Sequence, residues 1–176
     1  MARKNLAAKA KKIKMLLLDV DGVMTDGSIT YGEECREIKS FNVRDGVSIK
    51  WLQRAGIEVA ILSGRRSKAL AYRAKELGIN RAIQFQPIKL PAFTKLLEQT
   101  GLQPEEVAYI GDDIYDLPVL RRAGLGACPA DAVAEVRKVS HYVCKSAGGH
   151  GAVREVAEII LKAQGKWANI VGQFDV

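Results

Sequence analysis

The chain has little of what disulfide frameworks and zinc sites are built from. Its 176 residues include only three cysteines, Cys35, Cys128 and Cys144, and two histidines. The cysteines lie far apart, their number is odd, and no CxxC pair occurs. This pattern argues against both kinds of site and is typical of proteins kept in a reducing cytosol. We therefore expect a cytoplasmic location.

Long apolar runs are also absent. No segment approaches the ~20 apolar residues that a membrane-spanning helix needs. The basic N-terminus is not followed by the ~7–15 apolar residues of a secretion signal, so we expect no cleaved leader and no membrane partner. Hydrophobic residues make up 48% and charged residues 27%, which is ordinary for a soluble domain. A chain of this length suits one domain with a sizeable core.

Positive charge is concentrated at the N-terminus. The formal net charge is +7, and much of the excess comes from six basic residues among the first 14. A nucleic-acid-binding arm is one interpretation of such a run. A solvated, partly disordered tail is the other, and it is the commoner case at a chain end. We therefore divide the chain into a basic tail over residues 1–12, one domain over 13–164 and a C-terminal tail over 165–176.

Helical patterns that end in glycine alternate with short apolar runs along the chain. Glycine just past a helix readily takes the left-handed conformation that satisfies the last carbonyl groups. Short apolar runs bounded by turn residues are typical of strands covered on both faces. We predict an α/β fold, a three-layer Rossmann-like parallel sheet with helices on both faces. The glycines are Gly56, Gly78, Gly101 and Gly124; the runs are Met15–Val20, Ile57–Leu62, Ala82–Phe85, Val107–Ile110 and Leu125–Cys128.

One segment departs from this alternation. Residues Ser28–Val43 place Ile29, Tyr31, Ile38 and Phe41 around a Gly-Glu-Glu turn. We predict a β-hairpin flap that projects from the sheet after the first strand. A single small domain cannot cover its apolar side chains, and exposed apolar patches usually mark contacts.

The first predicted strand ends in a pair of carboxylates. Side chains that act in an open parallel sheet gather beyond the carboxyl ends of its strands. Here the run is Asp19-Val20-Asp21-Gly22. If the extended backbone continues through Asp21, both carboxylates point the same way, and the glycine allows a sharp turn. One carboxylate can attack phosphorus while the other handles the proton of the leaving group. A solvated acidic turn is the alternative for this motif taken alone.

Two further strand ends carry groups suited to an anion. Ser63 and Gly64 follow the second strand and open a helix, where backbone N–H groups and the helix dipole attract negative charge. Lys89 stands at the start of a later helix, an unfavourable place for a cation that suits a lysine pointing into an anionic site. The alternatives are a plain helix cap by Ser63 and a surface position for Lys89.

The fourth strand end is acidic. The run from Gly111 to Asp116 places three carboxylates, Asp112, Asp113 and Asp116, within five residues. Mg²⁺ takes oxygen ligands and is commonly held by one or two carboxylates together with a substrate phosphate. The same run also suits helix capping by Asp112 or Asp113, and both roles can coexist.

These four motifs, in this order, resemble the haloacid dehalogenase-like phosphatase superfamily. Residues 13–166 also resemble one family within it, the 3-deoxy-D-manno-octulosonate 8-phosphate phosphatases of lipopolysaccharide sugar synthesis. The segments that carry this second resemblance are residues 19–27, 41–46, 148–155 and 163–166. The resemblance implies that residues 13–164 form a haloacid dehalogenase-like phosphatase domain.

The resemblance implies a magnesium-dependent phosphatase with an aspartyl-phosphate intermediate. Asp19 would attack phosphorus, and Asp21 would protonate the leaving oxygen and then activate the hydrolytic water. Mg²⁺ would be held by the carboxylates of Asp19 and Asp112 and by the backbone carbonyl of Asp21. The groups for phosphate and substrate would be Ser63, Gly64, Arg65 and Lys89, with Asp113 and Asp116 in support.

The resemblance also implies how the site is closed. Residues 20–62 hold only the predicted hairpin and one helix, so we expect no cap domain between the first two motifs. The family would instead form a homotetramer in which hairpins pack together and a neighbouring subunit covers each site. The C-terminal tail, with Lys166, Trp167, Ile170, Val171 and Phe174, would reach a neighbouring active-site mouth; packing on its own subunit is the alternative.

The implied substrate is a small phosphorylated sugar acid, 3-deoxy-D-manno-octulosonate 8-phosphate. Two departures from the family pattern bear on the sugar: residues 85–88 replace a stretch that is often small and polar, and Leu117 stands where tryptophan is frequent. A nonulosonate 9-phosphate (sialic-acid-type) phosphatase is the alternative. Nucleic-acid binding by the basic tail is disfavoured, because the acidic motifs are intact and aromatic clusters that read RNA are missing. The roles of His150 and Arg154 stay open.

Overall fold

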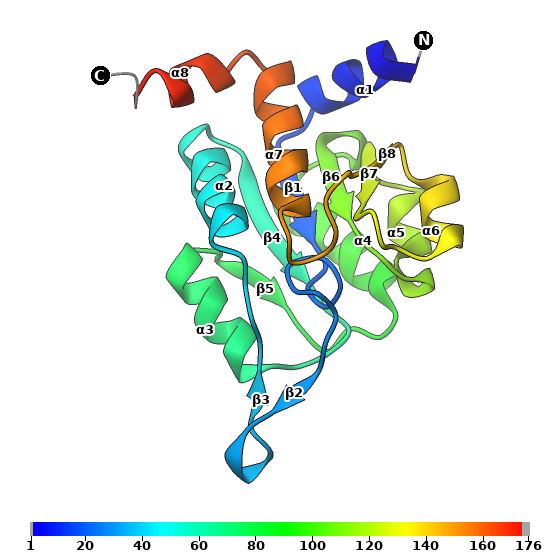
Figure 1. Cartoon of the computed structure of the whole chain (residues 1–176). Coiled ribbons are helices and arrows are strands. Elements are labelled where there is room, and N and C mark those ends of the chain that lie inside the picture. Colours follow the sequence, from blue (N-terminus) through cyan, green and yellow to red (C-terminus); the bar gives the residue numbers. More distant parts are fainter. Residues whose placement is uncertain (1, 174–176) are drawn as a thin grey trace.

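A six-stranded sheet forms the centre of the molecule. The computed structural model describes residues 2–173. The strand order is β5-β4-β1-β6-β7-β8, and every adjacent pair is parallel. Helices cover both faces (Figure 1), so the predicted α/β architecture is confirmed. The strands are β1 (Met15–Leu18), β4 (Glu58–Leu62), β5 (Arg81–Ile83), β6 (Val107–Ile110), β7 (Leu125–Cys128) and β8 (Tyr142–Val143).

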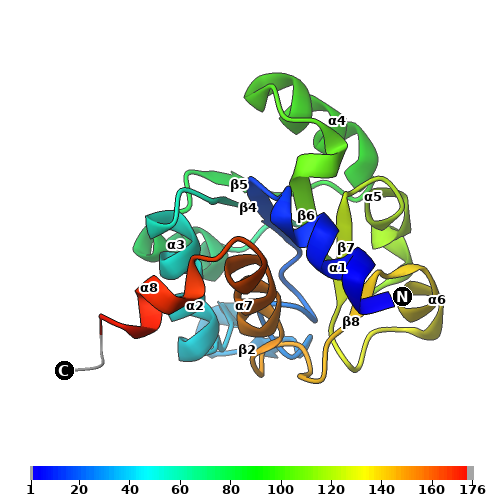
Figure 2. The same cartoon turned by 90° about the horizontal axis from the view of Figure 1, so that it is seen from above.

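The helices form two layers on opposite faces of the sheet (Figure 2). One layer holds α1 (Ala2–Lys11), α2 (Val43–Arg54), α3 (Lys68–Leu77) and α7 (Ala152–Ala163), with α8 (Trp167–Val171) packed beside it. The other holds α4 (Lys89–Thr100), α5 (Leu117–Leu120) and α6 (Ala134–Val139). Short 3₁₀ turns lie at η1 (Glu33–Cys35), η2 (Pro104–Glu106) and η3 (Ile114–Asp116). No helix within residues 2–173 is long and apolar enough to cross a membrane.

The central strand β1 shows why its sequence is continuously apolar. Side chains alternate between the two faces of a strand. Leu16 and Leu18 therefore pack into the core on the α2–α7 side, whereas Met15 and Leu17 pack into the core on the α4–α6 side. Both faces are covered, so every position is apolar. After β1 the chain adds β4 and β5 on one side of it, and then crosses over to add β6, β7 and β8 on the other side. This reversal of direction leaves a crevice beyond the carboxyl end of β1.

Several details of the strand and turn predictions differ from the structure. The run predicted over Ala82–Phe85 forms a strand only over Arg81–Ile83, and Phe85 has a positive φ of 61°. The sixth strand, β8, was not predicted because it has only two residues, one of which is exposed. Gly56, Gly78 and Gly101 have the expected positive φ angles, but Gly124 does not. Glycine is needed there for another reason, since a Cβ at that position would lie 2.3 Å from the Glu105 carbonyl oxygen.

The predicted hairpin is present as an antiparallel pair. Strands β2 (Thr30–Tyr31) and β3 (Glu37–Ile38) pair with Thr30 opposite Ile38. The pair projects away from the body of the molecule (Figure 1). The predicted segment runs past the end of β3 into the next element, because Asn42 caps α2 and Val43 begins that helix.

The N-terminal segment is a helix where a partly disordered tail was expected. In α1, Ala10 is fully buried and packs with Ile13 against the core. Lys9 Nζ donates to the Gly124 carbonyl at 3.0 Å, and Gln164 Nε2 donates to the carbonyls of Ala10 and Ile13 at 3.3 and 2.7 Å. The sequence prediction rested on the basic charges of this segment and missed its narrow apolar stripe. Packing of this stripe against α7 orders the segment.

Residues 165–173, the described part of the C-terminal segment, pack on their own subunit, and the reach of the tail to a neighbouring active site stays a prediction. The rings of Trp167 and Trp51 meet edge to face with centroids 5.5 Å apart, and Ile170 is buried. Lys166 Nζ donates to the Ala55 carbonyl at 2.8 Å, at the end of the sheet opposite the carboxyl ends of the strands. Lys166 therefore does not reach the site of its own subunit, and Phe174 lies outside the described residues.

Candidate active site

A pocket of about 460 Å³ opens at the carboxyl ends of β1, β4 and β6. Gly22, Gly27, Pro87 and Tyr115 form part of its wall. All nine residues that the sequence predicted for the site also line it, although they come from four separate strand ends. These are Asp19, Asp21, Ser63, Gly64, Arg65, Lys89, Asp112, Asp113 and Asp116.

Asp19 lies at the bottom of this pocket, directly after β1. Its N–H donates to the Ile110 carbonyl at 3.0 Å, which continues the pairing of β1 with β6. Its Oδ2 lies 2.8 Å from Lys89 Nζ, and both side chains are nearly buried. Burial, together with the charge of Asp116, raises the pKa of Asp19 to about 7, although Lys89 opposes this shift. Burial alone would lower the pKa of Lys89, but the charges of Asp19 and Asp116 raise it above its ordinary value.

Asp116 is the centre of the buried polar contacts. Its Oδ1 accepts from Lys89 Nζ at 2.5 Å and from the Tyr109 hydroxyl at 2.6 Å. Its Oδ2 accepts from the backbone N–H groups of Asp112 and Asp113 at 2.9 and 3.2 Å. The carboxylate thus ties α4, β6 and the acidic turn together. Of the two residues predicted to support the site, Asp116 contacts Lys89, whereas Asp113 is exposed and caps η3 through a 2.6 Å bond from Ile114 N–H.

The carboxylates of the site fit a hard divalent cation. One oxygen from each of Asp19, Asp112 and Asp116 lies within 4.8 Å of the others. Burial, followed by the charges of Asp19 and Asp116, raises the pKa of Asp112 to about 8, although Lys89 opposes this shift. The oxygens of Asp116 are already used by protein donors, so Asp19 and Asp112 are the carboxylates left for Mg²⁺.

Gly22 makes the close approach of these carboxylates possible. Its φ angle is +81°, and a Cβ on it would lie 2.1 Å from Asp112 Oδ2. The turn that it opens is supported from the far side by the glycine-rich loop before α7. Gly149 N–H donates to the Val23 carbonyl at 3.0 Å, and a Cβ on Gly148 would lie 1.9 Å from the Gly22 carbonyl oxygen. The segment 148–151 therefore supports the turn after β1.

The second motif differs from the sequence prediction in one respect. Ser63 is buried and its Oγ accepts from Arg65 N–H at 3.2 Å, but α3 begins only at Lys68, with Ser67 as its cap. The dipole of α3 therefore does not act at Gly64. An anion there would meet the backbone N–H groups of the loop and the nearby side chains instead.

Asp21 has partners that the sequence did not indicate. Lys39, from the segment after β3, donates to Asp21 Oδ1, and Arg65 Nη1 lies 3.6 Å from Oδ2. Glu37 contacts the same two cations. Burial would raise the pKa of Glu37, but hydrogen bonding from Ser67 and the charge of Lys39 lower it below its ordinary value. Glu37 and Lys39 lie on either side of Ile38 in the sequence, and this spacing indicates that their side chains point to the same face of the strand.

The two residues left open by the sequence lie outside the pocket. Arg154 stacks over the Trp51 ring at 4.3 Å and pairs with Glu158 at 2.8 Å. Its backbone N–H donates to the buried Asp45 at 2.8 Å. His150 is exposed in the glycine-rich loop.

Comparison with known proteins agrees with this geometry. A model of the haloacid dehalogenase-like hydrolases matches residues 33–124. The 3-deoxy-D-manno-octulosonate 8-phosphate phosphatase of Escherichia coli K12 is 47% identical over 169 residues, which is 96% of this chain and 90% of that protein. The chain belongs to the family of 3-deoxy-D-manno-octulosonate 8-phosphate phosphatases. Two solved structures of this family are also similar to this chain in fold.

The first structure comes from Moraxella catarrhalis and was solved in complex with a magnesium ion, a phosphate ion and KDO. It superimposes with a TM-score of 0.95 at 43% identity, covering 97% of this chain and 98% of that one. The second, from Yersinia pestis, has a TM-score of 0.90 at 48% identity and covers 92% and 88% of the two chains. Membership of the 3-deoxy-D-manno-octulosonate 8-phosphate phosphatase family thus rests on both sequence and fold.

Proposed function

We propose that this chain is a magnesium-dependent phosphatase that hydrolyses 3-deoxy-D-manno-octulosonate 8-phosphate to the free sugar acid and phosphate, within lipopolysaccharide biosynthesis. The observation that carries the proposal is the position of Asp19. It ends the central strand at the bottom of the pocket, 2.8 Å from Lys89 and beside Asp112. Family membership supports the choice of substrate. The three free cysteines suit the proposed cytoplasmic location.

Asp19 is the proposed nucleophile. One carboxylate oxygen attacks phosphorus, the bond to the sugar oxygen breaks, and a phosphate ester forms on Asp19. Lys89 lies against Asp19 and supplies positive charge where phosphate oxygens gather, and the Gly64 N–H and Ser63 bind the remaining oxygens. Mg²⁺, held by the carboxylates of Asp19 and Asp112 and the backbone carbonyl of Asp21, would offset the repulsion between nucleophile and dianionic phosphate.

Asp21 is the proposed acid and base. It lines the pocket two residues after Asp19, and among residues 2–173 its Oδ2 makes only a long contact with Arg65. It would protonate the departing sugar oxygen and then take a proton from the water that hydrolyses the aspartyl phosphate. Arg65 is the side chain proposed to bind the sugar acid, because it lines the pocket and a guanidinium matches a carboxylate.

We propose a homotetramer assembled through the hairpins. Ile29, Tyr31 and Ile38 are each more than half exposed on the projecting β2–β3 pair. Such a patch is unusual on a monomer, and covering it would also exclude water from an open pocket. Light scattering should give four subunits, and Ile38→Asp should dissociate them. A stable, fully active monomer would contradict this assembly.

The substrate is tested with matched sugar phosphates. Phosphate release should be fastest from the 8-phosphate of the eight-carbon keto acid, and chelation of Mg²⁺ should abolish it. The alternative, a nonulosonate 9-phosphate, draws on the departure of residues 85–88 from the family pattern, where Phe85 and Ile88 are 64% and 72% exposed. A higher kcat/KM on the 9-phosphate would support that alternative. Asp19→Asn should lower turnover of either sugar by orders of magnitude without unfolding the protein.

A further inference from the structure

Four charged side chains form a closed ring at the mouth of the pocket. Lys39 donates to Asp21 and lies 3.3 Å from Glu37 Oε1. Arg65 completes the ring, with Nη2 2.7 Å from Glu37 Oε1 and Nη1 3.6 Å from Asp21 Oδ2. Two cations and two anions alternate around the ring, so its net charge is zero.

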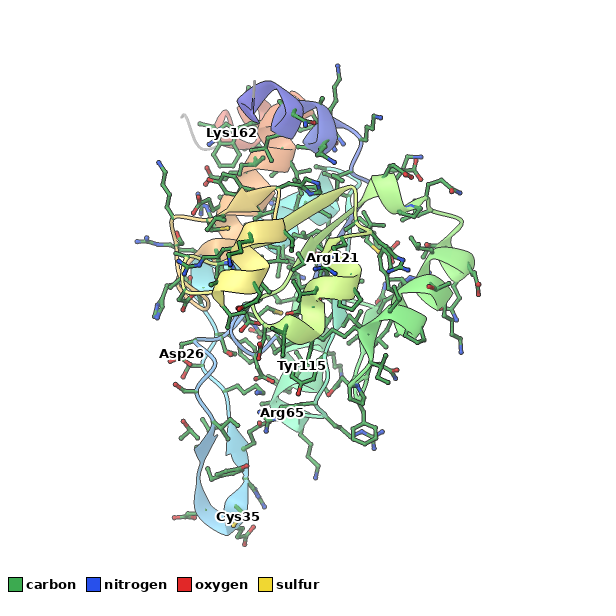
Figure 3. All side chains as sticks on the ribbon, turned by 90° about the vertical axis from the view of Figure 1, so that its right-hand side faces the viewer. Asp26, Cys35, Arg65, Tyr115, Arg121 and Lys162 are labelled. Carbon is green, nitrogen blue, oxygen red and sulfur yellow. The ribbon has the colours of Figure 1, made fainter. Side chains whose placement is uncertain are left out.

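The hairpin supplies one side of this ring. Glu37 and Lys39 are two residues apart in an extended segment, so their side chains point to the same face. Ile38 between them points the other way and is 51% exposed. Figure 3 shows Arg65 beside the base of the hairpin, whose far tip is marked by Cys35. The inner face of the returning strand thus contacts the site, while its outer face is free for a second subunit.

The burial of Lys39 makes the arrangement specific. Its side chain is only 2% exposed, although its ammonium carries a full charge. An ammonium out of water is tolerated only where carboxylates surround it, and removing one partner of such a set leaves the other charge uncompensated. A surface lysine would tolerate many positions of the hairpin, whereas this one is compatible only with a hairpin placed against Asp21.

We propose that Lys39 and Glu37 are positioning residues through which the hairpin holds Asp21 and Arg65 in place for the reaction. Lys39 holds Oδ1 of Asp21, while Oδ2, within the part of the chain that the structure describes, has only the long contact to Arg65 and keeps room for a proton-transfer contact. Glu37 holds the guanidinium of Arg65. The inference rests on the acid and base role proposed for Asp21. Through these contacts, packing of the hairpins in the proposed tetramer also affects the position of Asp21 in the same subunit.

The test compares leaving groups in Lys39→Met, which keeps the length of the side chain and removes its charge. With enzyme in excess, release of the free sugar acid reports the first half-reaction alone. We expect this rate to fall by about tenfold or more, since general acid catalysis typically contributes 10²–10⁴-fold. Release of nitrophenolate from an aryl phosphate, which needs no proton, should change by less than about threefold. Lys39→Arg should recover most of the loss.

The matched control is Arg36→Met, on the same hairpin. Arg36 pairs with Glu34 near the tip, where both are exposed, and its replacement should leave both rates unchanged. A Lys39→Met enzyme that keeps its wild-type rate on the sugar phosphate overturns the inference. So does an equal loss on both substrates, which would indicate a structural role only. If Lys39→Met fails to fold, Lys39→Arg and Glu37→Gln are compared in the same way.

Asp21→Asn, measured alongside, separates the inference from the proposed function. If Asp21→Asn releases the free sugar acid at the wild-type rate, the acid role of Asp21 is wrong, and the positioning role that depends on it is wrong as well. If Asp21→Asn loses that rate and Lys39→Met does not, only the positioning role is wrong.

Discussion

Removing Mg²⁺ should make the stability of this protein fall as the pH rises. In the unfolded chain, Asp19 and Asp112 release their protons near the ordinary pKa of 3.8, whereas in the metal-free fold their pKa values are about 7 and about 8. Between these limits the folded state binds more protons than the unfolded state. Stability that is present below pH 4 is therefore lost progressively as the pH rises through 7 and 8.

The size of the effect follows from these two pKa values. One pKa unit corresponds to about 1.4 kcal/mol. Raising the pH from 6 to 9 crosses about one unit below the folded-state pKa of Asp19 and about two units below that of Asp112, so the free energy of unfolding should fall by about 4 kcal/mol. Mg²⁺ requires the ionised carboxylates, so its binding should release close to two protons at pH 6 and almost none at pH 9.

The assay is urea unfolding with excess chelator and with saturating Mg²⁺, at pH 6 and pH 9. We expect the gain from Mg²⁺ to be several-fold larger at pH 9. Calorimetry in buffers of different ionisation enthalpy gives the proton count directly. Asp112→Asn is the matched control, because it removes the group with the higher pKa and should remove at least half of the pH dependence. Equal stability of the chelated wild-type protein at both pH values would refute the reasoning.

Three further changes test individual contacts. Tyr109→Phe removes a buried hydroxyl that joins the lysine and aspartate of the site, and should cost about 1–3 kcal/mol of stability and weaken inhibition by inorganic phosphate. Trp167→Ala should lower the unfolding free energy by about 2 kcal/mol, since α8 would lose its main aromatic contact; no change would argue against its packing on its own subunit. Gly148→Ala would place a Cβ 1.9 Å from the Gly22 carbonyl and should disrupt the site, whereas Gly165→Ala, which has open space and a φ of +68°, should cost only about 1 kcal/mol; activity and melting temperature distinguish the two.

Local pattern was sufficient for the framework of the fold. The run before Asp19 reads as a strand covered on both faces because each successive side chain enters a different core. Gly78 and Gly101 end α3 and α4 in the left-handed conformation, as their position after a helical pattern indicated. These features depend on a few neighbouring residues, so one sequence contains enough information to predict them.

The membership of the pocket could also be predicted, because parallel strands bring their carboxyl ends to one edge. Asp19, Ser63, Lys89 and Asp112 meet there although they are far apart in the chain. Which acidic residue would hold Lys89 could not be predicted. The short 3₁₀ turn η3 buries Asp116 and leaves Asp113 exposed, and one sequence does not show which of the two faces inward.

The sequence by itself therefore determined which strands end in functional residues and which kinds of groups meet at those ends. Only the tertiary structure decided the partners of those groups. Tyr109 reads as an ordinary strand residue, and Lys39 as an ordinary hairpin lysine, until folding buries each beside a carboxylate. The N-terminal helix likewise reads as a charged tail until Ala10 meets the core. In each case the deciding energy is that of desolvation, which depends on what a distant part of the chain places against the residue.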